Sequence, residues 1–417
     1  MSIASKSPHS TAQRAQIRQY ASECVMCGIC VPYCPTFALS RNEADGPRGR
    51  ISLALGLAEG TLAANPDVVA HLDGCLTCRA CESVCPSQVQ YGALIDEVRG
   101  ALAQNVFSAT TSLNESTQPK AAQHRWTLWR NRIFSQRQTF GRLWAVLTFF
   151  ERMHLGGFIR RFGGRFGQAL PPQTPSRLPR RFRPNQVANL QPANAKKVGL
   201  FIGCTGESLN SDAVRASIRV LNALGYAVEI PKVQVCCGAM HQHGGDLERA
   251  AALRAENRTV FGGADLTALL VIGTACAGEL LREANSVPVI EITDFLAEIP
   301  DAEWSPLPPN PARVAIHLPC SQTRMLKQPA STERLLQKIP GLKIVPLATN
   351  NRCCGAAGLH LLMYPEQADT LRTPKLIELN ELKPDFVVSA NIGCATHIAA
   401  GLGAPVVHPV ELVAMGL

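Results

Sequence analysis

No stretch of this sequence is apolar for long enough to cross a lipid bilayer. The longest apolar runs without a charge, residues 143–150 and 266–278, are shorter than the roughly 18 residues of a spanning helix. The first twenty residues also lack the apolar centre of a signal peptide. We therefore expect a cytoplasmic protein with reduced or metal-bound thiols, and peripheral contact with the inner face of the cytoplasmic membrane is left open.

Charge is scarce and unevenly distributed. Asp, Glu, Lys and Arg make up 18% of the 417 residues, and the formal net charge is +9. Residues 101–197 alone hold 16 Lys and Arg against Glu115 and Glu151, so the remainder of the chain is net negative. Basicity confined to one segment, without a recognisable nucleic-acid-binding module, argues against nucleic acid as a partner.

Nucleotide-binding fingerprints are also missing. The glycines at 244–245 and the GLG at 401–403 match neither the GxGxxG nor the GxxxxGK(S/T) spacing. No Ser-His-Asp or paired-carboxylate arrangement stands out. The sequence therefore predicts no flavin or nicotinamide in this chain and offers no catalytic residue.

Cysteine, in contrast, is abundant, and its 16 copies fall into four sets of four. Two of these sets have the spacing CxxCxxCxxxCP and lie 51 residues apart. Iron–sulfur clusters need four converging thiolates, and in paired runs of this kind the fourth cysteine of each run binds the other cluster. We predict two [4Fe-4S] clusters, one held by Cys24, Cys27, Cys30 and Cys85 and the other by Cys75, Cys78, Cys81 and Cys34. Zinc is the alternative, although its sites usually show two CxxC pairs.

The other eight cysteines define a second repeat. Each copy has one cysteine, then CCG, then a further cysteine, and the copies lie 116 to 118 residues apart. The first copy holds Cys204, Cys236, Cys237 and Cys276, and the second holds Cys320, Cys353, Cys354 and Cys394. Each copy could gather four thiolates around a further iron–sulfur cluster or metal ion. Buried structural cysteine is the simpler alternative.

Four histidines lie close to these cysteines in the sequence. His241 and His243 follow the first CCG, His317 precedes Cys320, and His397 follows Cys394. Each could act as a ligand or proton carrier. For any one of them, a helix-start or core position is the more common role.

The patterns around the cysteines predict the fold class. The N-terminal part is expected to be helical, with Pro47 near the start of one helix and Gly60 at its end. Each CCG copy begins with a strand-like run and continues with a helix, at 211–224 and 331–339. We expect an α-helical ferredoxin-like dicluster domain at 1–104, a connector at 105–195, and two α/β CCG domains at 196–305 and 306–417.

The connector is basic, contains three of the four tryptophans and ends in a proline-rich linker. Interleaved aromatic and arginine residues suit a packed helical connector, a docking surface for a partner subunit, or a peripheral contact with anionic lipid. These three interpretations remain open at this point.

Together these motifs resemble the iron–sulfur subunits of bacterial glycolate oxidases, within the wider set of proteins related to heterodisulfide reductase. The resemblance covers nearly the whole chain and is weakest in the connector. It rests on CVMCGICVPYCP, DGPRGRI, HLDGCLTCRACESVCPS, both CCG copies and SANIGCATH. It implies an electron-transfer subunit of an oxidoreductase complex, which accepts electrons from FAD-containing partner subunits and passes them toward quinone or the respiratory chain.

One departure bears on function. The heterodisulfide reductase pattern ends in CxxC, whereas the corresponding tetrads here are GTAC and NIGC, so each copy offers four thiolates rather than five. The resemblance therefore favours electron transfer within a 2-hydroxy-acid dehydrogenase, with glycolate as the favoured substrate and its oxidation on a partner flavoprotein. The alternatives are a thiol/disulfide oxidoreductase, or the equivalent subunit for D-lactate or glycerol-3-phosphate.

Overall fold

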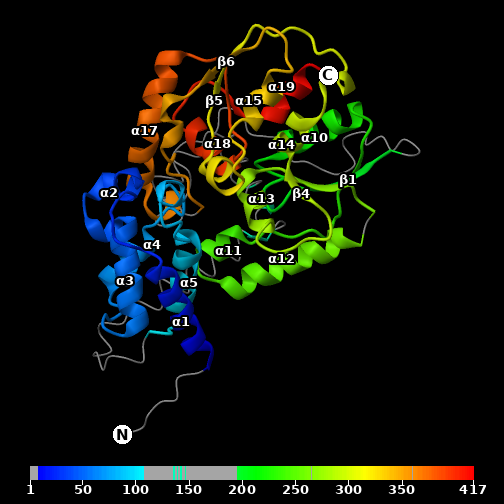
Figure 1. Cartoon of the computed structure of the whole chain (residues 1–417). Coiled ribbons are helices and arrows are strands. Elements are labelled where there is room, and N and C mark those ends of the chain that lie inside the picture. Colours follow the sequence, from blue (N-terminus) through cyan, green and yellow to red (C-terminus); the bar gives the residue numbers. More distant parts are fainter. Residues whose placement is uncertain are drawn as a thin grey trace. The chain divides into compact units, whose positions relative to one another are not determined.

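The computed structural model describes residues 8–107, 195–263, 265–358 and 360–417, and six single positions between 135 and 146. These residues form two compact units (Figure 1). The first unit contains residues 8–107 and 239–251, and the second contains the rest of the two cysteine-rich copies. The connector expected at 105–195 falls almost entirely outside the described residues.

The first unit is helical. Its helices are α1 (Pro8–Ser22), α2 (Pro35–Ser40), α3 (Pro47–Glu59), α4 (Pro66–Asp73), α5 (Tyr91–Ala103) and α11 (Ala239–His243), and the first turns of α12 (Leu247–Gly262) join them. Proline occupies the first turn of α2, α3 and α4, where its fixed φ suits a helix start. Gly60 ends α3 at φ +82°, as the sequence predicts. The core of this unit is formed by Ile17, Leu57, Leu72, Leu94 and their neighbours.

The second unit contains two four-stranded parallel sheets of identical topology. The first sheet has the order β2 (Ala227–Glu229), β1 (Lys197–Phe201), β3 (Ala268–Val271), β4 (Val289–Glu291). The second has the order β6 (Lys343–Pro346), β5 (Arg313–Ile316), β7 (Phe386–Val388), β8 (Val406–Val407). Parallel neighbours require crossover helices, and so the alternation of strands and helices in the sequence leads to this architecture.

The helices between the strands of the first sheet are α10 (Ser211–Ala223), α11, α12 and α13 (Thr274–Leu280), and α14 (Ile292–Glu298) follows its last strand. Those of the second sheet are α15 (Ser331–Leu336), α16 (His360–Met363), α17 (Pro365–Leu382) and α18 (Ile392–Ala399), and α19 (Pro409–Met415) follows its last strand. Helix α15 ends three residues before the predicted 339, because Pro340 disfavours helical geometry just ahead of it.

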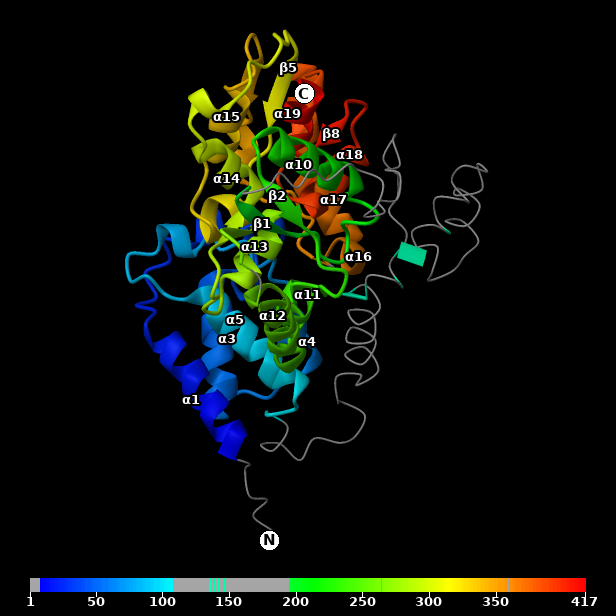
Figure 2. The same cartoon turned by 90° about the vertical axis from the view of Figure 1, so that its right-hand side faces the viewer.

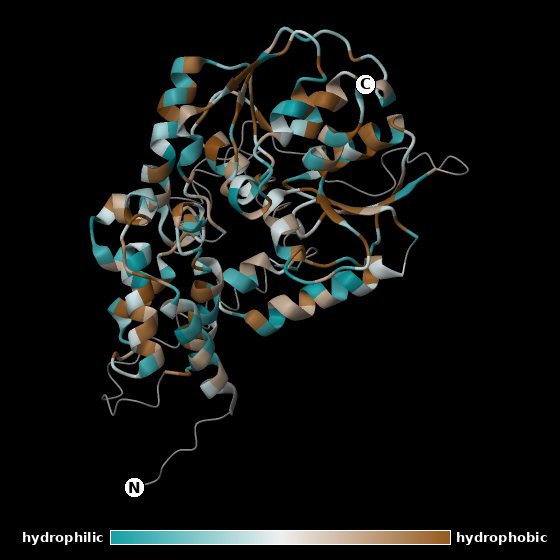
Figure 3. Cartoon of the chain, in the orientation of Figure 1, coloured by the Kyte–Doolittle hydropathy of each residue, from teal (hydrophilic) through white to brown (hydrophobic). Residues whose placement is uncertain are grey.

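Helices cover both faces of the second sheet (Figures 1 and 2). Along β5, Val314 and Ile316 join a core shared with α15 and α19, while Ala315 between them packs with residues of α17 and α18. The core on the α15 side also includes Val198 and Leu200 of β1, so the two cysteine-rich copies share one apolar interior. In Figure 3 the hydrophobic colour accordingly dominates the strands and alternates with the hydrophilic colour along the helices.

The predicted fold class is confirmed: a helical part is followed by two α/β repeats. The exact domain boundaries remain predictions. Among the described residues, no helix is both long and apolar enough to span a membrane.

Candidate metal centres

The two CxxCxxCxxxCP runs have the same backbone conformation. The residue two positions after the first cysteine is left-handed in both runs, Met26 at φ +56° and Thr77 at φ +49°. The residue four positions after the first cysteine is also left-handed in both runs, Gly28 at φ +81° and Arg79 at φ +55°. A 3₁₀ turn, Val31–Tyr33 or Glu82–Val84, then leads to the fourth cysteine. Three non-glycine residues held in this sparsely populated region indicate that the rest of the fold enforces the loop shape.

The first recess in this unit is lined by Cys24, Cys27, Cys30 and Cys85. Cys81, Ile51, Val89 and Tyr91 complete much of its wall. Burial raises the pKa of Cys30, and the neighbouring thiols of Cys24, Cys85 and Cys27 raise it further. A metal that replaces these protons would relieve the repulsion among the thiolates.

The second recess is lined by Cys34, Cys75, Cys78 and Cys81. Burial raises the pKa of Cys81 well above its ordinary value, and Cys78, Cys75 and Cys34 add to the effect. In each recess, therefore, three cysteines of one run meet the fourth cysteine of the other. The structure thus brings together the two groups of four that the sequence predicts.

The two recesses adjoin one another. Pro47, Cys81 and Tyr91 line both of them. The Tyr91 hydroxyl lies 3.6 Å from Cys75 Sγ, and Thr36 Oγ1 lies 3.2 Å from Cys34 Sγ. Groups held in the two recesses would therefore share Pro47, Cys81 and Tyr91 as neighbours.

The spacing of these thiols suits a polynuclear cluster better than a single ion. Among the described residues, one group of three or more potential donors is close enough together to bind a single ion, and it consists of His317, Cys354 and Cys394. The eight N-terminal thiols line recesses without forming such a group. An iron–sulfur cluster fits this donor set because its iron atoms are bound by cysteine thiolates around a larger core.

Two arginines differ in how they approach the recesses. Arg50 lines the second recess and is fully buried, with Nη1 donating to Thr36 Oγ1 at 2.9 Å and Nε donating to the His71 carbonyl. Arg48 lines the first recess but is partly exposed and is paired with Glu43 at 2.7 Å. A buried guanidinium favours negative charge in the second recess. The sequence motif DGPRGRI contains both arginines, but the motif alone predicts no role for either.

Arg99 of α5 is a further residue that the sequence does not reveal. Its guanidinium donates to the carbonyls of Leu72, Asp73 and Cys75 and to that of His243 in α11. It thereby fixes the start of the second cysteine run against both α4 and α11. Nothing in the sequence distinguishes this arginine from a solvent-exposed helical arginine.

In the first cysteine-rich domain, the four thiols form a chain of contacts from Cys204 through Cys236 and Cys237 to Cys276. Cys237 Sγ lies 3.3 Å from Cys276 Sγ. Contact with Cys236 and burial raise the pKa of Cys204, and contacts with Cys236 and Cys276 raise the pKa of Cys237. The CCG turn places Cys236 and Cys237 side by side, since Gly238 has φ +99°.

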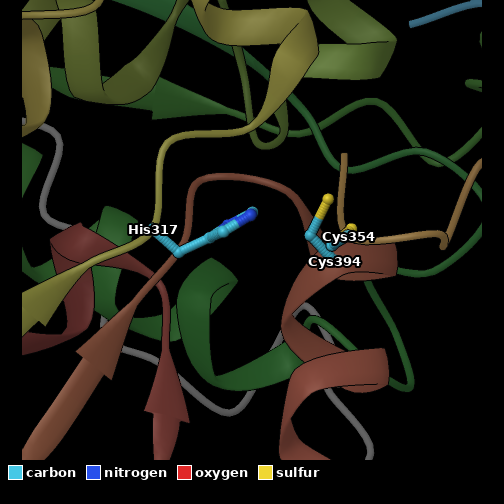
Figure 4. Close-up of side chains that lie close together, drawn as sticks. All are labelled: His317, Cys354 and Cys394. Atoms are coloured by element: carbon cyan, nitrogen blue, oxygen red, sulfur yellow. The ribbon is translucent and has the colours of Figure 1, made fainter. Parts of the chain in front are cut away.

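The second cysteine-rich domain has the same chain of sulfur contacts. Contact with Cys353 raises the pKa of Cys320, and the Cys354 thiol contacts both Cys353 and Cys394. The CCG turn closes at Gly355, with φ +86°. Here the imidazole of His317 points toward Cys354 and Cys394 (Figure 4).

Matching polar groups hold the strand ends in the two domains. Gln234 accepts from the Ile202 amide and donates to the Leu200 carbonyl. Asn350 does the same with Leu318 and Ile316 in the second domain. The first cysteine of each set follows directly after this clamp.

The segments that carry the two sets of thiols are hydrogen-bonded to each other. The Thr274 amide, at the start of α13, donates to the Ala390 carbonyl at 3.0 Å. The Thr274 and Ser321 hydroxyls are 2.6 Å apart, and Asn391 Nδ2 approaches Ser321 Oγ at 3.4 Å. Thus the segments that carry Cys276, Cys320 and Cys394 meet.

The four histidines singled out by the sequence all have hydrogen-bond partners, and that of His317 is Ser389 at 3.0 Å. His241 Nδ1 lies 3.0 Å from Asp246, His243 Nδ1 lies 3.1 Å from Asp96, and His397 Nε2 lies 3.1 Å from the Ala368 carbonyl. His317 is different, because it faces thiols. Burial lowers its pKa well below the usual value, and the charge of Lys375 adds to the effect.

Comparison with known proteins agrees with these sites. The family model described as a 4Fe-4S dicluster domain matches residues 20–89, and that described as a cysteine-rich domain matches residues 198–280 and 314–399. These descriptions and the thiol-lined recesses define the class: an iron–sulfur protein that combines a dicluster domain with two CCG domains.

Full-length relatives are more specific. The glycolate oxidase iron-sulfur subunit of Escherichia coli (strain K12) is 30% identical over 94% of this chain and 93% of its own length. The probable glycolate oxidase iron-sulfur subunit of Bacillus subtilis (strain 168) is 27% identical over 91% of this chain and 88% of its own. A fumarate reductase (CoM/CoB) subunit of Methanothermobacter marburgensis is 31% identical over 49% of this chain and 42% of its own.

This chain belongs to the family of glycolate oxidase iron-sulfur subunits. It is therefore an electron-transferring component of a glycolate oxidase-like oxidoreductase complex, and the resemblance inferred from the motifs is confirmed.

Proposed function

We propose that this chain carries electrons within a membrane-associated 2-hydroxy-acid dehydrogenase or oxidase, with glycolate as the substrate of the complex. Electrons come from an FAD-containing partner subunit and pass toward quinone. Two [4Fe-4S] clusters, bound when the protein is loaded, supply one-electron transfer. We assign one to Cys24, Cys27, Cys30 and Cys85, and the other to Cys75, Cys78, Cys81 and Cys34.

The observation that carries this proposal is the pair of adjoining recesses, each with thiols from both runs. Two one-electron carriers side by side can divide the two electrons of a reduced flavin into single transfers. Arg50, buried beside the second recess, holds positive charge where electron density would accumulate. The two recesses therefore provide different electrostatic surroundings for their clusters.

The first recess is the better exchange point with a partner. Cys27 is exposed, and the loop around it presents Val25, Ile29 and Tyr33, which are 68%, 50% and 56% exposed. Large apolar side chains on a cysteine loop suit the small, transient contact of an electron-transfer partner. We propose that the flavin-bearing subunit docks on this loop.

Substitution of single ligands tests the electron path. In the complex with its flavoprotein, Cys24→Ser or Cys75→Ser is expected to abolish electron delivery to a quinone and to leave flavin reduction by glycolate intact. Ser22→Ala, on the exposed end of α1, serves as the control and should behave as wild type. Loss of flavin reduction in the cysteine variants would contradict the proposal.

Composition of the native complex provides the direct test. Anaerobic purification from the host, with iron, sulfide, zinc and flavin quantified, should give about eight iron atoms in the dicluster part and a co-purifying flavoprotein. Iron without any flavoprotein partner, combined with disulfide reduction by the isolated chain, would instead support a thiol/disulfide oxidoreductase. The thiol contacts of Cys237 with Cys276 and of Cys354 with Cys394 favour this second candidate.

Membrane association is proposed on the basic connector, which lies outside the described residues. Neutralisation of Arg160, Arg161, Arg165, Arg180, Arg181 and Arg183 is expected to release the complex from membranes, because anionic lipid attracts clustered arginine. Sedimentation with membrane vesicles measures this, and unchanged sedimentation would contradict the role.

A further inference from the structure

We propose that the second cysteine-rich domain holds a single zinc ion, with His317 as a nitrogen ligand beside the thiolates of Cys354 and Cys394. The site lies outside the two recesses of the dicluster part, and its assignment does not depend on the proposed substrate. The first cysteine-rich domain, which lacks the histidine, is not built for the same ion.

The geometry of three donors carries this assignment. One ligand atom from each of His317, Cys354 and Cys394 lies within 4.8 Å of the other two. All three residues are buried, at 2%, 3% and 7% exposure. Donors bound to one tetrahedral zinc at about 2.0 to 2.3 Å lie roughly this far apart or closer. A modest inward movement therefore completes the site.

The three donors come from separate elements that are each fixed independently. His317 directly follows β5, Cys354 belongs to the CCG turn, and Cys394 lies in the first turn of α18 (Figure 4). The side chain of Asn391 caps α18 and accepts from the Gly393 and Cys394 amides. A site assembled from a strand end, a turn and a capped helix is held by the whole domain.

His317 is oriented as a metal ligand should be. Its Nδ1 lies 3.0 Å from Ser389 Oγ, which leaves Nε2 as the atom that meets the thiols. Partners of this kind fix the tautomer and ring orientation of ligating histidines. We assign the fourth position to Cys353, whose thiol contacts that of Cys354 but lies outside the group of three, so that it would have to move inward.

A buried cation accompanies the thiols. Lys375 of α17 is fully buried, and its charge interacts with those of Cys353, Cys354 and Cys394. Its Nζ donates to the Thr349 carbonyl at 2.6 Å. Three thiolates and one imidazole on a divalent ion leave one net negative charge, which an adjacent ammonium balances.

The first domain has different residues at the corresponding positions. Phe201 ends β1 where His317 follows β5, and the residues of α12 and α17 that bond the segment ahead of each CCG turn are Asn257 and Lys375. Phe201 and Asn257 are buried, and Phe201 packs against the ring of Phe261. An aromatic ring and a neutral amide offer neither a ligand nor a counter-charge. The sites are therefore chemically distinct despite their equal thiol counts.

X-ray absorption at the zinc edge tests the assignment on the unaltered full chain, purified anaerobically. We expect one zinc per chain, with sulfur neighbours at about 2.3 Å and a histidine nitrogen at about 2.0 Å. A zinc site with sulfur neighbours alone would overturn the role of His317. Absence of zinc, or iron in place of zinc that is lost in Cys394→Ser, would overturn the single-ion assignment.

His317→Phe introduces the residue that the first domain already accommodates. It should remove the nitrogen signal and make zinc on the order of ten-fold easier to extract with a chelator. His397→Asn is the matched control, because His397 lies in the same helix as Cys394 but faces the Ala368 carbonyl, and should retain both signals. Equal zinc retention in both variants would contradict the proposal. Iron and sulfide content reports separately on the dicluster part, so failure here leaves the electron-transfer proposal standing.

Discussion

In the first cysteine-rich domain the neutral side chain of Asn257 holds the backbone of the CCG turn, whereas in the second the buried charge of Lys375 lies near the thiols. The strand order, the four cysteines and even the Gln234 and Asn350 clamps are the same. The two domains therefore share one scaffold, but the residues that hold their CCG turns differ in charge. A cysteine count alone would assign both sites the same chemistry, but their neighbours do not.

The domains also differ in the segment that comes after the CCG turn. After the first turn the chain enters α11, which packs with α5: His243 contacts Asp96, and Arg99 donates to the His243 carbonyl. After the second turn, α16 and α17 stay within their own unit. A segment of the first copy, residues 239–251, thus belongs to the same unit as the dicluster part, whereas no described segment of the second copy does.

The largest expected effect concerns the second CCG turn. Gly355 has φ +86°, and a Cβ there would lie 2.6 Å from the Ala368 carbonyl oxygen. Gly355→Ala should reduce the free energy of unfolding by about 3 kcal/mol, because both the backbone conformation and the close packing oppose a side chain. Urea unfolding followed by circular dichroism measures it. Gly358→Ala, with φ +52° and open space around it, is the control and should cost about 1 kcal/mol.

The packing of residues 239–251 against α5 provides the next test. Gly245 has φ +83°, and a Cβ would lie 2.6 Å from the Arg99 carbonyl oxygen. Gly245→Ala should loosen the segment from α5 at a cost of about 2 kcal/mol, seen as faster proteolysis between residues 238 and 251. The comparison between the two copies would be weakened if cleavage there were unchanged.

A smaller difference in stability is expected for the residues that hold the segments ahead of the two CCG turns, Asn257 and Lys375. Asn257 makes three buried hydrogen bonds, to the Val235 amide and to the Cys236 and Leu253 carbonyls. Asn257→Ala should cost about 2 kcal/mol, because these groups lose their partner. In the metal-free chain with protonated thiols, Lys375→Met should cost less than about 1 kcal/mol, since removal of the buried charge offsets the lost bond to Thr349. Equal losses in urea unfolding would contradict this distinction.

The smallest effect is a pH dependence that the two copies share. Burial raises the pKa of Asp294 in α14 and of Glu411 in α19 to about 7, and the charge of Glu291 adds to the effect at Asp294. The folded protein therefore retains protons that the unfolded chain releases, so stability should fall as pH rises from about 4 to 7. Asp294→Asn should flatten this fall and raise the melting temperature at pH 8 by about 2 °C. The same melting temperature as wild type at pH 8 would contradict the assignment.

Much of this architecture could be predicted because cysteine spacing is a local property. The two runs, the CCG copies and the parallel strands all follow from residues that are close in the sequence. The grouping of Cys85 with the first run and Cys34 with the second depends on a known rule for such runs.

Other features depend on contacts over long sequence distances. Burial of Arg50 beside the second recess, the direction of the His317 ring and the packing of α11 on α5 leave no periodic signal. Met26, Thr77 and Arg79 adopt left-handed conformations that their residue types do not favour, so only the folded loop identifies them.

Because α11 packs with the dicluster part, that part is not formed by one continuous segment of the chain. Asp96 is 2% exposed, and its partners Gln242 and His243 lie more than a hundred residues away in the sequence. A gene fragment that ends after α5 would leave this carboxylate without those partners. The dicluster part is thus not an interchangeable cassette: exchange with another ferredoxin-like domain would also have to bring a matching stretch at residues 239–251.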